Sequence, residues 1–197
     1  MNKLYFRYGV MGSSKTAEAL MCRFNYIQKG FNVLLLKPSI DNRFEAETPQ
    51  VISRIGIKAD CIKFDKTQSI IKLFEAENSK KKIDVIIVDE CQFATTRQIE
   101  ELRRIAYDIP VLCYGLLTNF KTELFEGSKR LIELADSLQE VKTICTCGRK
   151  ASVNARLIDG KITTNGAEIL IGAEESYEGM CYLCFRKRLC SQKTKNE

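Results

Sequence analysis

Residues 9–16 read Gly-Val-Met-Gly-Ser-Ser-Lys-Thr, and this octamer constrains the fold of the chain more than any other segment. A strand-like run, Leu4–Tyr8, precedes it. The helix-like run that follows ends near Gly30 and has apolar residues at Ala17, Leu20, Met21, Phe24 and Ile27. A strand, a tight loop and a helix in this order are typical of a phosphate-binding loop, whose backbone N–H groups surround the phosphates.

The predicted phosphate-binding residues are Gly9, Val10, Met11, Gly12, Ser13, Ser14, Lys15 and Thr16. Lys15 is expected to reach the outer phosphates of a nucleoside triphosphate, and the Thr16 hydroxyl to ligate Mg²⁺. Ser14 replaces the second glycine of the usual pattern, which normally lets the backbone approach phosphate without a Cβ. An ordinary strand-to-helix turn without a ligand is the alternative interpretation of the octamer.

A second segment, 85–90, reads Val-Ile-Ile-Val-Asp-Glu. Four consecutive β-branched residues predict a strand buried on both faces, as in a parallel sheet. Ligands of such sheets bind at the carboxyl ends of the strands. Asp89 is therefore expected to hold Mg²⁺ through water, and Glu90 to act as a general base. Two solvated acids at the end of a strand are the alternative.

Composition limits the chemistry of this 197-residue chain. It contains no histidine, so a general base must be Asp or Glu, and a metal site with soft ligands must be all-cysteine. The nine cysteines, without an export signal, predict a reducing cytoplasm. No apolar run approaches the ~20 residues of a membrane helix, so we expect no membrane partner. The net charge is +6, but charged residues of both signs are spread along the chain, so we expect no nucleic-acid partner.

Strand-like and helix-like segments alternate up to residue 142. The predicted strands are 33–36, 61–64 and 111–114. Helices are predicted at 67–77 and around 131–135. Another predicted helix starts from a cap at Thr96 and carries Ile99, Leu102 and Ile105. Residues 39–60 are expected to be irregular. This alternation predicts an α/β fold, with a parallel sheet covered by helices on both faces.

From residue 143 the pattern changes, and two cysteine pairs bracket the segment: Cys145 and Cys147, then Cys181 and Cys184. Their spacing predicts a structural Zn²⁺ held by four thiolates, with two pairs of buried, unligated thiols as the alternative. Asp159-Gly160 and Asn165-Gly166 predict hairpin turns between the pairs. We therefore expect a phosphate-binding domain at 1–142, a zinc lobe at 143–190, and a disordered basic tail at 191–197.

In this order the motifs resemble the zinc-containing thymidine kinase family over about residues 3–187. The resemblance rests on the octamer, on Asp41-Asn42-Arg43, Asp89-Glu90-Cys91-Gln92-Phe93 and Gly115-Leu116-Leu117-Thr118-Asn119-Phe120, and on Ile171-Gly172-Ala173-Glu174-Glu175-Ser176-Tyr177 before the last cysteine pair. It implies a RecA-like P-loop parallel sheet with helices on both faces, plus a small zinc-ribbon-like C-terminal lobe. It also implies a homotetramer with feedback binding of thymidine triphosphate.

The implied reaction transfers the γ-phosphoryl group of ATP, with Mg²⁺, to the 5′-hydroxyl of thymidine. Glu90 would be the base, Asp89 and Gln92 would join the octamer around ATP, and Arg43 would add positive charge. The implied nucleoside site comprises Phe93, Leu116, Phe120, Phe125, Glu168, Ile169, Leu170, Ile171, Gly172 and Tyr177, with Met11 near the base. Plain core packing is the alternative role of the phenylalanines.

Two other functions compete with this one. An ATP-dependent zinc-ribbon module that binds nucleic acid would also use Asp89-Glu90 and a basic tail, although the chain is short for paired helicase lobes. A zinc-stabilised scaffold with an inactive nucleotide site would account for Ser14.

Overall fold

The computed structural model describes residues 3–40, 48–166 and 177–193. A six-stranded sheet forms its centre, and neighbouring strands run parallel at every pairing. The strand order is β5 (Ile62–Phe64), β2 (Val33–Pro38), β6 (Val85–Val88), β7 (Val111–Gly115), β1 (Leu4–Tyr8) and β8 (Ser137–Glu140). Every residue of β6 and β7 is buried, as expected for central parallel strands.

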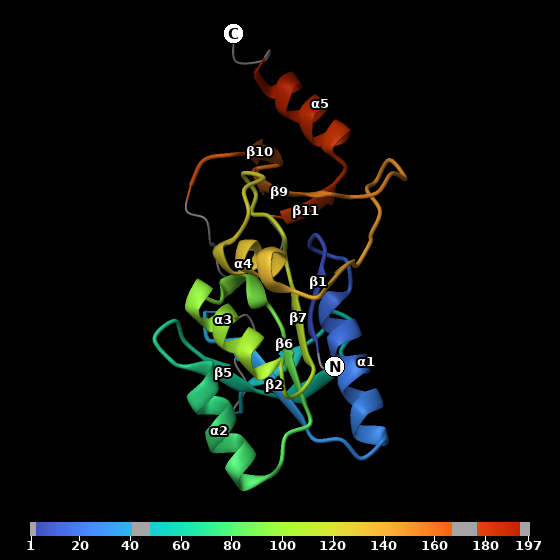
Figure 1. Ribbon diagram of the computed structural model, residues 1–197. Coiled ribbons are helices and arrows are strands. Elements are labelled where there is room, and N and C mark those ends of the chain that lie inside the picture. The colour runs from blue at the N-terminus through green and yellow to red at the C-terminus, as the bar shows by residue number, and fades with distance from the viewer. Residues whose placement is uncertain (1–2, 41–47, 167–176, 194–197) are drawn as a thin grey trace.

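Helices cover both faces of this sheet, which confirms the predicted layers (Figure 1). On one face, α1 (Lys15–Gln28) packs through Ala19 and Leu20 against Leu35 and Ile87. The other face is covered by α2 (Ile70–Lys80), α3 (Thr96–Ile105) and α4 (Glu126–Leu134). Successive strand residues thus point into different cores, since side chains alternate across a strand.

The structure corrects the prediction that residues 39–60 are irregular. Within that stretch, β3 (Gln50–Ile52) and β4 (Lys58–Asp60) form an antiparallel hairpin. Val51 is fully buried and joins the core beneath α1. These strands have three residues each, so their apolar alternation is too short to stand out in the sequence.

Helix starts also differ from the predictions. Thr95, not Thr96, caps α3: its hydroxyl accepts the Gln98 N–H, and the Gln98 side chain accepts the Thr95 N–H. This reciprocal pair is a capping box, and it leaves Thr96 to bond with Glu126.

Two further segments begin elsewhere than expected. Ser69 caps α2, which therefore starts and ends three residues beyond the predicted 67–77. The last helix of the domain, α4, starts at Glu126 rather than near residue 131, and strand β8 after it was not predicted. The β8 sequence Ser-Leu-Gln-Glu is largely polar because this strand lies at the edge of the sheet.

The C-terminal lobe lies beyond the carboxyl ends of the central strands (Figure 1). It comprises a separate sheet with the order β10 (Lys161–Thr163), β9 (Val153–Ile158) and β11 (Tyr177–Met180), followed by α5 (Tyr182–Lys193). The Asp159-Gly160 turn joins β9 to β10 with positive φ at both residues, which confirms the first expected hairpin.

The second expected turn, Asn165-Gly166, follows β10, and the chain after it lies outside the described residues. Helix α5 continues to Lys193, three residues into the segment expected as a disordered tail. None of the helices in the described ranges combines the length and the apolar character needed to cross a lipid bilayer.

Candidate functional site

The octamer forms a tight loop between β1 and α1. The Gly9 N–H donates to the Gly115 carbonyl oxygen over 3.2 Å, which ties the loop to the end of β7. A Cβ on Gly9 would lie 2.4 Å from the Val141 carbonyl oxygen, so only glycine fits there. Gly12 has a φ of 78°, a left-handed conformation that glycine adopts without strain.

Lys15 folds back across this loop. Its Nζ donates to the Val10 carbonyl oxygen over 2.8 Å and to the Ser13 hydroxyl over 3.2 Å, and the residue is only 8% exposed. The ammonium group held in this loop adds its charge to the positive end of the α1 dipole. Such a site suits phosphate.

Ser14 occupies the left-handed region, with a φ of 64° and a ψ of 20°. The chain therefore keeps the backbone conformation for which the usual motif has glycine. A non-glycine residue there costs about 1–3 kcal/mol, so the loop carries local strain.

Ser14→Gly should relieve this strain and raise the free energy of unfolding by about 1 kcal/mol. The ATP KM should change by less than about tenfold, because the backbone already has the required shape. Thermal unfolding and steady-state kinetics check both expectations. Ser79→Gly, inside the exposed part of α2, is the matched control and should lower stability by about 0.5–1 kcal/mol. Loss of activity in Ser14→Gly would instead assign the Ser14 hydroxyl a direct role.

Thr16 and Asp89 meet at the start of α1 and the end of β6. The Thr16 hydroxyl donates to Oδ1 of Asp89 over 3.4 Å, and Asp89 is 3% exposed. The Asp89 N–H donates to the Leu36 carbonyl oxygen of β2, which fixes the residue between two central strands. A hydroxyl and a carboxylate are hard oxygen donors of the kind that Mg²⁺ prefers, so the predicted pair fits this metal.

Glu90 follows with a φ of 52°, again left-handed, and precedes the short 3₁₀ helix η1 (Cys91–Phe93). The Gln92 side-chain amide donates to Oε2 of Glu90 over 2.5 Å, and its Oε1 accepts the Leu116 N–H over 3.0 Å. Gln92 thus joins the Glu90 carboxylate to the backbone of Leu116. Gly115 leaves room for the Gln92 side chain, because a Cβ at position 115 would lie 2.6 Å from Oε1 of Gln92.

Two of the three predicted phenylalanines contact each other. The rings of Phe93 and Phe125 meet edge to face, with centroids 5.7 Å apart. Leu116 precedes Phe125 in the chain. Its carbonyl oxygen accepts a hydrogen bond from the Ser128 hydroxyl over 2.5 Å, which fixes its backbone. Phe93 and Leu116 remain partly exposed, so both have surface to offer a ligand.

Phe120 belongs to a different group. It is 1% exposed and lies under the guanidinium of Arg156, whose central carbon is 5.0 Å from the ring centroid. Tyr177 pairs with Arg156 across β9 and β11, and partial burial raises the pKa of Tyr177. The remaining predicted residues, Arg43 and those from Glu168 to Gly172, lie outside the described residues.

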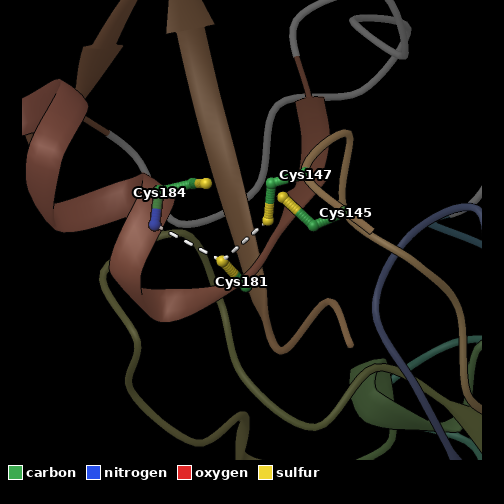
Figure 2. Close-up of side chains that lie close together, drawn as sticks. All are labelled: Cys145, Cys147, Cys181 and Cys184. Carbon is green, nitrogen blue, oxygen red and sulfur yellow. Dashed lines mark hydrogen bonds between the residues drawn. The ribbon is translucent and has the colours of Figure 1, made fainter. Parts of the chain in front are cut away.

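The four cysteines of the C-terminal lobe come together, as predicted from their spacing. Figure 2 shows their sulfurs converging from two elements: Cys145 and Cys147 from a tight turn, and Cys181 and Cys184 from the start of α5. All four Sγ atoms lie within 4.8 Å of one another, and those of Cys147 and Cys181 are 3.6 Å apart. Tetrahedral Zn–S bonds of about 2.3 Å would separate sulfurs by about 3.8 Å, so the cluster has the size of a zinc site.

The electrostatics of this cluster also suit a cation. Backbone N–H groups of Cys147 and Cys181 lower the pKa of the Cys145 thiol to about 6. Side-chain hydrogen bonds to the same two cysteines raise the pKa of Cys184 to about 12. Thiols this close therefore share protons, and a divalent metal ion can replace those protons and ionise all four sulfurs. The group can hold a structural metal ion.

Three residues at the site were missed by sequence reasoning. Asn154 and Arg156 alternate on β9 with Val153 and Ala155, which pack in the core of the lobe. Two buried polar residues spaced by two in an apolar strand are a signal that could have been noticed. Arg54, in the β3–β4 turn, lies with Nη1 3.7 Å from where a Cβ of Gly12 would be, and nothing local in the sequence indicates this.

Comparison with known proteins identifies relatives along the whole chain. The family model "Thymidine kinase" matches residues 2–185. The "Thymidine kinase" of Shewanella oneidensis is 42% identical over 190 residues, covering 95% of this chain and 98% of that relative. That of Haemophilus influenzae is 41% identical over 195 residues, covering 98% of this chain and all of that relative. Among solved structures, the Legionella pneumophila ATPase DotB has a TM-score of 0.40 at 15% identity, covering 76% of this chain and 43% of that one.

Proposed function

The chain belongs to the thymidine kinase family, and from this premise we propose how its residues phosphorylate thymidine. The activity is ATP-dependent transfer of a phosphoryl group to thymidine. Family membership does not favour the competing nucleic-acid-binding module. Our proposal concerns the role of each residue, the metal ions and the assembly.

The observation that carries the proposal is the contact between Thr16 and Asp89, which joins the phosphate loop that holds Lys15 to the end of β6 that carries Glu90. The loop amides and Lys15 bind the outer phosphates of ATP. Thr16 and Asp89 hold Mg²⁺, which supplies charge neutralisation for the transferring group when bound. The phosphate-binding groups, the magnesium ligands and the base thus come from two turns that meet at the contact between Thr16 and Asp89.

Glu90 accepts the proton of the thymidine 5′-hydroxyl. Its carboxylate lies one residue beyond the magnesium carboxylate, and Gln92 holds it in place over 2.5 Å. A base orients the hydroxyl for in-line attack on the γ-phosphorus and receives its proton as the new P–O bond forms. Arg43 remains a proposed source of positive charge.

The nucleoside lies against Phe93 and Leu116, with Met11 near the base, and the more deeply buried Phe120 and Phe125 help to wall this pocket. The partly exposed surfaces of Phe93 and Leu116 support this placement. Residues 168–172 and Tyr177 close over thymine. The metal of the four-cysteine cluster is Zn²⁺, because four thiolates in tetrahedral spacing select it over harder cations.

We further propose a homotetramer in the cytoplasm, with feedback binding of thymidine triphosphate across the phosphate loop and nucleoside site. On α1, Met21, Phe24 and Ile27 are 57%, 60% and 41% exposed, and an apolar helix face of this kind supports self-association. The cysteines of the described residues form no disulfide, which suits a reducing compartment.

A panel of nucleosides with Mg²⁺ and ATP tests the function. Thymidine should give thymidine monophosphate with ADP in equal amounts, and deoxycytidine and adenosine should give little product. ATP hydrolysis stimulated by single-stranded DNA, with no monophosphate from any nucleoside, would contradict the proposal.

A further inference from the structure

Met11 of the phosphate loop is held by a residue from outside its own domain. Its backbone N–H donates to Oδ1 of Asn154 over 2.8 Å. Nδ2 of Asn154 donates in turn to the Thr118 carbonyl oxygen, also over 2.8 Å. Asn154 lies in β9 and is 2% exposed. One buried side chain therefore joins the phosphate loop, the loop after β7 and the C-terminal lobe.

Gly179 of β11 contacts the same loop residue. It is the cross-strand partner of Asn154 between β9 and β11. A Cβ on Gly179 would lie 3.1 Å from the Met11 carbonyl oxygen and 3.3 Å from a Val10 methyl group. The β11 backbone thus packs directly on the loop, with room for a hydrogen atom only.

Val10 adds an apolar contact to these two. It is 8% exposed and packs in the hydrophobic core of the C-terminal lobe, with Val153 and Met180 among its neighbours. The lobe therefore holds two successive loop residues through a hydrogen bond, a close backbone contact and a shared core. Because phosphates bind to the backbone N–H groups of this loop, its conformation sets ATP affinity.

We propose that Asn154 is a positioning residue that couples the ATP and thymidine sites. Thr118 lies between Leu116 and Phe120 of the proposed nucleoside site, and strand β11 begins at Tyr177, so the inference rests on the thymidine site proposed above. A nucleoside bound beside Thr118 restricts Asn154, and through it the Met11 N–H, and so pre-organises the loop for ATP. By thermodynamic linkage, ATP must then raise thymidine affinity by the same factor.

The first experiment measures the Kd of a non-hydrolysable ATP analogue with Mg²⁺ in the absence of nucleoside. Asn154→Ala should weaken binding by roughly tenfold, because the Met11 amide loses its anchor. Asn165→Ala, an exposed asparagine of the same lobe, is the matched control and should bind like wild type. A Kd for Asn154→Ala within about twofold of wild type overturns the positioning role.

The second experiment repeats the titration at saturating thymidine. Thymidine should tighten analogue binding to the wild type by about fivefold or more, and by less than about twofold in Asn154→Ala. Gly179→Ala pushes β11 away from Met11 without removing a polar group. In this variant, too, thymidine should tighten analogue binding by less than about twofold. Metal content checks that each variant keeps its lobe folded.

Other results of the second experiment have distinct meanings. The coupling is overturned if thymidine tightens analogue binding to both variants as much as to the wild type. It is also overturned if the wild type binds thymidine but its affinity for the analogue does not change. If direct titration finds no thymidine binding to wild type, the proposed function fails and the coupling with it. The first experiment still decides whether Asn154 positions the phosphate loop.

Discussion

Glu90→Gln should lower kcat for thymidine phosphorylation by about 10²- to 10⁴-fold, while the Kd values of ATP and thymidine stay within about threefold of wild type. Glutamine keeps the size of the side chain and an oxygen that can accept the Gln92 hydrogen bond. It lacks the basic carboxylate that takes the proton of the 5′-hydroxyl. The change therefore separates proton transfer from substrate binding.

Single-turnover kinetics and binding titrations measure the two effects separately. Glu75→Gln, on the exposed side of α2, is the matched control and should leave kcat unchanged within about twofold. If Glu90→Gln retains activity within about threefold of wild type, Glu90 is not the base. An equally large loss of substrate binding would instead indicate that the carboxylate holds ligands.

Cys184→Ser should lose the structural metal ion and unfold the C-terminal lobe. The wild-type protein should carry about one zinc ion per chain, and metal binding of this kind supplies about 10–16 kcal/mol of apparent folding free energy in small zinc domains. Thymidine phosphorylation should fall below detection, because β9 and β11 of this lobe contact the phosphate loop. Metal analysis and thermal unfolding follow the loss.

Cys190→Ser is a close control for this variant. Cys190 lies in the same helix, is exposed, and is not part of the four-cysteine group. Its substitution should leave zinc content, the thermal transition and activity as in wild type. Full zinc content and unchanged stability in Cys184→Ser would refute the proposed ligand set.

The sequence predicted those parts of the site that local patterns determine. The octamer and the buried run at 85–88 each combine a periodic apolar signal with chemically distinctive residues, so the phosphate loop and both acids were placed correctly between their elements. The cysteine pairs were predicted for a similar reason: ligand spacing within each pair is local, and few chemistries need it. The parallel sheet followed from the alternation of elements.

Features that depend on distant partners could not be predicted in this way. Asn154 is 143 positions from Met11, so no window of sequence contains both ends of their hydrogen bond. The start of α3 was misplaced by one residue because adjacent threonines compete for the cap, and the Gln98 side chain decides between them. The β3–β4 hairpin forms because Val51 packs in the hydrophobic core beneath α1. These outcomes are set by tertiary packing rather than by propensity.

The alternation along β9 limits where the chain can change in length. Val153 and Ala155 pack in the core of the lobe, while Asn154 and Arg156 point toward the ATP-binding domain. Inserting or deleting one residue before Val153 would exchange these two faces and place a guanidinium among apolar side chains. Homologues and engineered variants should therefore differ in length at the Asp159-Gly160 turn, where an added residue leaves the register of the preceding strand untouched.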